Sequence, residues 1–77
     1  MERADVRRLE ITYPPELLSE PILYRLITQF QIVVNVLEAR VTSDEAWFVV
    51  EVEGPEVAVV RGLRWLVEQG LQVRDLP

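Results

Sequence analysis

Residues 30–42 read FQIVVNVLEARVT, and the interpretation of the whole chain starts from this stretch. A strand is expected from about Val34 to Val41, because apolar residues dominate the run. The polar segment TSDE turns the chain, and a further strand follows as WFVVEVE, residues 47–53. The exception is Asn35, whose amide is costly to bury without hydrogen-bond partners.

The residues before this stretch predict a strand and then a helix. Residues 8–13, RLEITY, alternate between apolar and polar side chains, as a half-buried strand does. Pro14 and Pro15 end that strand, because proline donates no backbone hydrogen bond. Ser19 is expected to cap a helix whose apolar residues recur at helical spacing as far as Phe30.

The residues after it predict a helix and a last strand. The helix is expected to open at residues 54–56 and to end at Gly70, where a C-cap glycine belongs. Gly62, in its middle, costs about 1 kcal/mol relative to alanine, and close approach of this helix to the sheet accounts for it. With a strand over residues 71–76, the order is βαββαβ. This order predicts an α+β, ferredoxin-like fold, a four-stranded antiparallel sheet with two helices on one face.

Composition restricts the classes of function. Seventy-seven residues form a single domain, 1–77, with a thin core that would gain from a partner subunit. The chain has no cysteine, histidine or lysine, which removes the usual general base, the usual metal ligands and Schiff-base chemistry. We therefore expect no enzyme activity, no catalytic residues, no cofactor and no metal.

Charge and hydropathy restrict the partners. The net charge of −5 disfavours nucleic acid and anionic membranes. No apolar run reaches the roughly 18 residues of a membrane span, and the start of the chain does not resemble a signal peptide, so a cytoplasmic location is expected. RNA-recognition domains share this element order but need aromatic side chains on the open face of the sheet. Here Glu10, Glu38 and Glu51 are expected on that face, which excludes RNA.

Two groups of side chains expected on the same face are candidate sites. Glu51 and Glu53 are interpreted as part of a solvated charge face, paired with Arg8 or Arg40, rather than as a catalytic carboxylate pair.

Trp47 and Val49 share that face by alternation, and with Val36 they would form an apolar patch. Such a patch is typical of a protein interface, here of a homodimer. The alternative is that Trp47 lies at a strand end and folds over its own loop.

The ordered series PILYRL, NVLEARV, VVEVEG and LRWLVEQGLQV resembles the NIL domain over residues 6–76. The family is named for an Asn-Ile-Leu tripeptide, which here is Asn35-Val36-Leu37. NIL domains occur as the methionine-binding, dimerising regulatory domain of methionine-import ATPases, and at the N-terminus of small iron–sulfur ferredoxins. The short TSDEA connection is more similar to the second setting.

Two roles for Asn35 follow. Alternation places it on the core face at the first residue of its strand, where an amide can satisfy unpaired backbone groups. The resemblance instead implies a ligand site at Asn35, Val36 and Leu37, because the motif asparagine lies at the methionine site of the importers. The expected function is a self-associating regulatory module that binds a small amino acid such as methionine. The alternative is a protein-interaction adaptor for iron–sulfur redox partners.

Overall fold

The computed structural model describes residues 4–77 and confirms the predicted element order. The elements are β1 (Ala4–Tyr13), a 3-10 turn η1 (Pro15–Leu17), α1 (Ile22–Phe30), β2 (Val33–Val41), β3 (Ala46–Pro55), α2 (Glu56–Glu68) and β4 (Gln72–Leu76). The four strands form one sheet in the order β2-β3-β1-β4, and each neighbouring pair is antiparallel. This is the α+β, ferredoxin-like fold that the sequence predicts.

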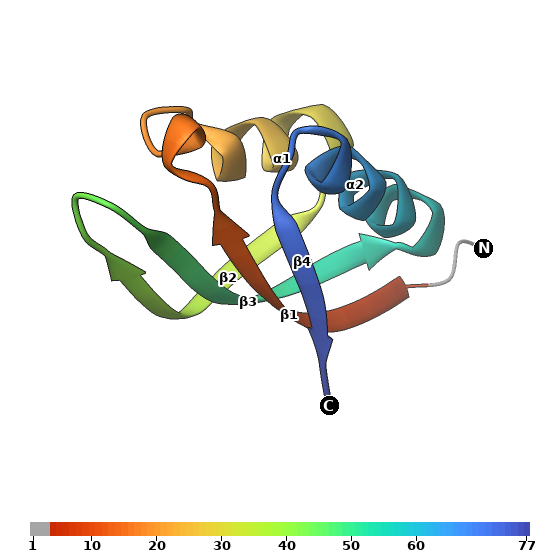
Figure 1. The fold of residues 1–77 in the computed structure, drawn as a ribbon. Coiled ribbons are helices and arrows are strands. Elements are labelled where there is room, and N and C mark those ends of the chain that lie inside the picture. The colour runs from red at the N-terminus through yellow and green to blue at the C-terminus, as the bar shows by residue number, and fades with distance from the viewer. Residues whose placement is uncertain (1–3) are drawn as a thin grey trace.

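Both helices lie on one side of the sheet (Figure 1). The core fills the space between them and the inward side chains of the strands, among them Leu9, Ile11, Val50 and Val52, which are fully buried. We call the opposite side of the sheet the open face. Neither helix of residues 4–77 is long and apolar enough to cross a membrane.

The first helix begins later than predicted. It starts at Ile22 after Pro21, without a side-chain cap, so the assignment of Ser19 as the N-cap is wrong. The chain turns on its own backbone before the helix, and the Glu20 N–H donates to the Leu17 carbonyl at 3.0 Å. The second helix begins at Glu56 as expected, and Gly70 has a φ of 103°, as a residue just beyond a helix C-terminus often does.

Gly62 lies where the two helices meet. A Cβ atom there would lie 3.0 Å from Leu26 Cδ1 and 3.4 Å from Ile32 Cδ1. The close approach is therefore to α1 and to Ile32, two residues beyond its end, and the prediction of close approach to the sheet is wrong. Nearby, the rings of Phe30 and Trp65 pack with centroids 5.8 Å apart.

A β-bulge in β2 reverses the expected faces of the strand. Val36 pairs with Val50, but the next pair is Glu38 with Val49, so Leu37 is the extra residue. Alternation read back from Val41 therefore slips by one residue at Leu37. Asn35 lies on the open face as the third residue of β2, so the prediction of a core-facing first residue is wrong.

The β2–β3 hairpin extends beyond the helices (green in Figure 1). Ala39 and Val41 lie opposite Phe48 and Ala46, on the helix side, as predicted. Val36 is on the same side, opposite the buried Val50. Because the helices do not reach over the hairpin, these β2 residues stay exposed.

Candidate functional site

Asn35 belongs to a row of four residues that crosses the whole sheet on the open face. It lies opposite Glu51 in β3, Glu51 lies opposite Arg8 in β1, and Arg8 lies opposite Leu76 in β4. We call these residues the transverse row. Directly opposed residues of neighbouring strands have Cα atoms about 4.5–5.5 Å apart. The Asn35 amide and the Arg8 guanidinium therefore flank the same carboxylate.

The centre of the row is an ion pair. Arg8 Nη2 lies 3.2 Å from Glu51 Oε2, and both side chains are partly exposed. A pair this accessible to water contributes little to folding stability. Both charges remain accessible to solvent. The pairing of Glu51 with Arg8 confirms the interpretation of this face as a cross-strand charge face.

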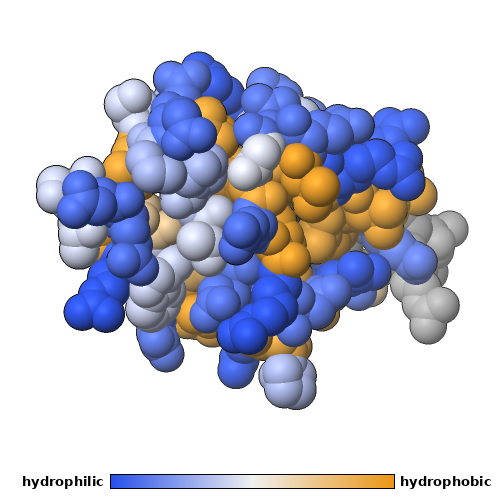
Figure 2. Space-filling model, viewed as in Figure 1, coloured by the Kyte–Doolittle hydropathy of each residue, from blue (hydrophilic) through white to orange (hydrophobic). Residues whose placement is uncertain are grey.

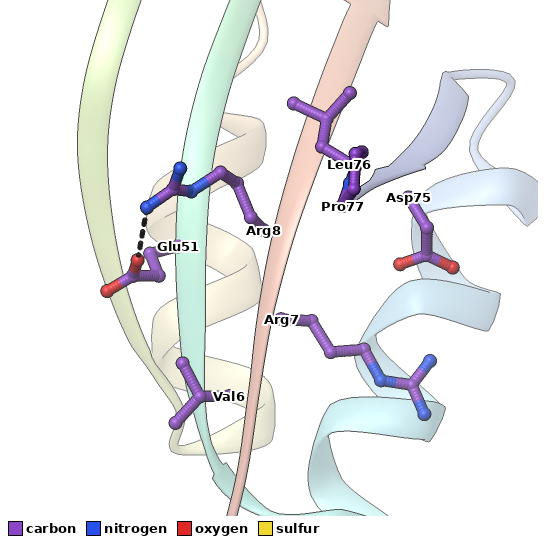
Figure 3. A pocket seen from close by; sticks show the side chains of 7 residues that line it. All are labelled: Val6, Arg7, Arg8, Glu51, Asp75, Leu76 and Pro77. Carbon is purple, nitrogen blue, oxygen red and sulfur yellow. Dashed lines mark hydrogen bonds and ion pairs between the residues drawn. The ribbon is translucent and has the colours of Figure 1, made fainter.

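A groove of about 510 Å³ adjoins the transverse row where β4 ends. The lining residues are Val6, Arg7, Arg8, Glu51, Asp75, Leu76 and Pro77 (Figure 3). The groove exists because β1 is longer than its neighbour: β4 pairs with β1 only from Arg8 to Thr12. The edge of β1 before Arg8 forms its floor.

The groove has a different lining on each side of β1. In Figure 3 the Arg8 side chain points toward Glu51, whereas the Arg7 side chain points the other way, toward a helix. Arg7 Nε lies 2.9 Å from Asp5 Oδ2 on that helix side. On the open face, Val6 and Leu76 place apolar surface beside Arg8.

This lining fits binding better than catalysis. A guanidinium binds a carboxylate through paired hydrogen bonds, and a carboxylate accepts hydrogen bonds from an ammonium group. Within residues 4–77, no three histidine, cysteine, aspartate or glutamate side chains gather as a metal site would require.

The interface predicted from sequence is not assembled as expected. Trp47 and Val49 lie on the open face, where Val49 is opposite Glu38 and Glu10. Val36 is on the helix side, so the prediction that it shares a patch with Trp47 and Val49 is wrong. Both open-face residues are half-buried among charged neighbours.

The groove is not predicted by the strand patterns of the sequence. Val6, Asp75 and Leu76 come from the two ends of the chain, and only the β1–β4 register brings them together. The sequence carries no local signal for the groove, because the strand patterns at residues 8–13 and 71–76 are equally long.

The family model of the NIL domain matches residues 7–75. The chain belongs to the NIL domain family. In this NIL domain the motif tripeptide is Asn35-Val36-Leu37, and the bulge falls within it.

The solved structures that share the fold include two of different origin. The C-terminal domain of an ABC transporter ATP-binding protein from Enterococcus faecalis superposes with a TM-score of 0.79 at 11% identity, covering 91% of this NIL domain and 82% of that chain. The de novo designed protein Foldit4 has a TM-score of 0.59 at 15% identity, covering 97% and 98%. No curated protein sequence matches significantly. At these identities the likeness concerns the fold alone.

Proposed function

We propose that this NIL domain is a non-enzymatic regulatory module that binds a small amino acid, such as methionine, on the open face and self-associates. The observation that carries the proposal is the transverse row. It places the motif amide of Asn35 beside an exposed ion pair, Glu51 with Arg8, at the margin of a groove.

The chemistry of an amino acid matches the row. Its α-carboxylate would bind Arg8 and its ammonium group would bind Glu51. Each side chain of the ion pair would then pair with an opposite charge of the ligand in place of the other side chain. Val6 and Leu76 offer apolar surface to the side chain of the ligand. Asn35 can accept or donate a hydrogen bond on the far side of Glu51.

A thermal-shift series with each of the twenty amino acids tests this proposal. Binding to the folded state raises the melting temperature by an amount that grows with ligand concentration. Asn35→Ala and Arg8→Gln should lose that increment. Gln72→Ala is the matched control, because Gln72 is an exposed amide two rows away, opposite Thr12. If no amino acid shifts the wild-type curve at millimolar concentration, the proposal fails.

A second function has one observation in its favour. Val57, Val60 and Val67 are exposed on α2, and Figure 2 shows apolar surface toward the right of the view, where Figure 1 places the first turns of α2. This surface suits a protein-interaction adaptor, for example for an iron–sulfur redox partner. An adaptor would ignore amino acids, so the thermal-shift series separates the two functions.

A further inference from the structure

The outer face of α2 carries two arginines among exposed valines. Its side chains are Val57, Val60, Arg61, Arg64 and Val67, and all five are exposed. Residues three or four apart on a helix are neighbours, so Arg64 has Val60 on one side and Val67 on the other. We call these five residues the α2 stripe. With a rise of 1.5 Å per residue, the stripe extends about 15 Å along the helix.

The two arginines of the stripe form no ion pair within residues 4–77. The ion pairs found there use other arginines, namely Arg7, Arg8, Arg25 and Arg74. Glu68 follows Arg64 by four residues, a spacing at which helical side chains can pair, but these two do not. An exposed guanidinium in this state can form paired hydrogen bonds with an incoming carboxylate.

A hollow of about 300 Å³ adjoins the stripe at the N-terminal end of α2. It lies between the last turn of α1 and the first turns of α2, and Val57 and Arg61 belong to both the stripe and the hollow. The rest of its lining is Gln29, Phe30, Gln31, Pro55 and Ala58. Apolar walls with a few polar groups are typical of a binding pocket. Because ligand pockets span roughly 300–1,000 Å³, a hollow of this size suits a side chain of a partner better than a large ligand.

We infer that the α2 stripe and the hollow together bind an acidic amphipathic segment of a partner protein. An apolar side chain of the segment enters the hollow, its carboxylates bind Arg61 and Arg64, and its other apolar side chains cover the valines of the stripe. The inference rests on the adaptor function proposed above and gives it a partner chemistry. It does not require that an amino acid binds on the open face.

Charge complementarity selects this occupant. The stripe is positive within a chain of net charge −5, so carboxylates are attracted here and repelled by most of the remaining surface. A basic partner would place its charge against Arg61 and Arg64. A purely apolar partner would bury both guanidinium groups without acceptors, which is costly. An anionic membrane also offers negative charge, but its recognition uses clusters of about four to eight basic residues, and the stripe has two.

Titration of the isotopically labelled protein with a synthetic peptide tests the inference. The probe is a helical peptide of about 16 residues with leucine on one face and glutamate on the other. The comparison peptide has lysine in place of each glutamate. The glutamate peptide should shift the backbone amide NMR signals of α2 and of residues 29–31, and the lysine peptide should not. No saturable shift at millimolar peptide, shifts confined to the open face, or equal binding of both peptides would each overturn the inference.

Matched substitutions test the two arginines. Arg61→Gln and Arg64→Gln should each weaken binding of the glutamate peptide by roughly tenfold, as the loss of a charge-assisted hydrogen bond does. Arg40→Gln is the control. Arg40 is also exposed and outside the ion pairs of residues 4–77, but it lies on the open face of β2. If Arg40→Gln weakened binding as much, the effect would be one of net charge and the inference would fail.

A valine substitution tests the apolar part of the stripe. Val57 is 65% exposed, so Val57→Ser should leave the fold intact and weaken peptide binding by roughly threefold or more. Val41→Ser is the control, because Val41 is 67% exposed and lies in β2. Binding of the peptide to Val57→Ser with the affinity of wild type would show that the stripe is not the docking surface.

Two further measurements separate this inference from its alternatives. Arg8→Gln, which should abolish the effect of amino acids, should bind the peptide as wild type does, so the two sites can fail independently. A loss of peptide binding in Arg8→Gln would place the peptide on the open face and overturn the inference. Wild type should stay in the supernatant when vesicles of phosphatidylglycerol are sedimented. Sedimentation with the vesicles that Arg61→Gln and Arg64→Gln abolish would identify a membrane as the occupant and would also overturn it.

Discussion

Asn35 lies directly opposite Glu51 across the β2–β3 pair, so its amide stands beside an ion-paired carboxylate on the open face. Asn35 is exposed. Among the side-chain hydrogen bonds formed within residues 4–77, none involves its amide. The described residues therefore show no side-chain hydrogen bond by which Asn35 would support the local backbone.

The first prediction follows from that exposure. Asn35→Ala should change the free energy of unfolding by less than about 0.5 kcal/mol without ligand, as substitutions of exposed residues usually do. Urea denaturation measures the change. Val50→Ala serves as the positive control. Val50 is fully buried, so its truncation should lower the free energy of unfolding by about 2 kcal/mol. If Asn35→Ala lowered the free energy of unfolding by more than about 1 kcal/mol, Asn35 would instead support the local backbone.

The second prediction concerns the contact between the helices. Gly62→Ala should lower stability by about 1 kcal/mol, although alanine is the better helix former. The added methyl group would lie 3.0 Å from Leu26 Cδ1, and Leu26 is buried and has little room to move. Chemical denaturation measures the loss. In a double-mutant cycle, Leu26→Val should cost less in the Gly62→Ala background than in wild type, and simple additivity would contradict the proposed clash.

The third prediction concerns Gln31, which ends α1 in the left-handed conformation with a φ of 56°. This conformation is unfavourable for a residue with a Cβ atom, whereas glycine adopts it readily. Gln31→Gly should therefore raise stability by about 0.5–1 kcal/mol, seen as a higher melting temperature. The converse change, Gly70→Ala at a φ of 103°, should lower it. If Gln31→Gly lowered the melting temperature, the Gln31 side chain would make a contact that stabilises the fold by more than the left-handed backbone destabilises it.

The fourth prediction concerns Tyr13, whose ring packs edge-to-face on Phe48 with centroids 5.3 Å apart. Burial raises the pKa of Tyr13 above its usual 10.0, and a hydrogen bond with the backbone of Leu23 opposes the shift. The folded state thus favours the neutral phenol. That contribution to stability is fully present below pH 10.0 and is lost as the pH rises through the folded-state pKa.

Denaturation at a series of alkaline pH values measures this effect. Stability of wild type should fall above about pH 10 more steeply than stability of Tyr13→Phe. Tyr24→Phe is the matched control, because Tyr24 is 68% exposed. Parallel curves for wild type and Tyr13→Phe would show that Tyr13 does not titrate differently on unfolding.

Part of the candidate site could be predicted from sequence. The tripeptide points to Asn35, and strand alternation correctly places Glu51 on the open face with Arg8 or Arg40 as its expected partner, of which the structure shows Arg8. Strand alternation places Val36 on the wrong face. It assumes that β2 pairs with β3 without interruption, whereas the bulge at Leu37 shifts the register. The groove was not foreseen, because the relative lengths of β1 and β4 depend on which residues pair.

The sequence by itself determined the order of the elements and the core. Periodicity of two in the strands and 3.6 in the helices reflects which side chains leave water, and that is a local property of the chain. The tertiary structure decided the faces of Asn35 and Val36, the helix partner of Gly62 and the open edge of β2. Each of these depends on how separate segments pack or pair in space, and in a strand one extra residue exchanges the two faces.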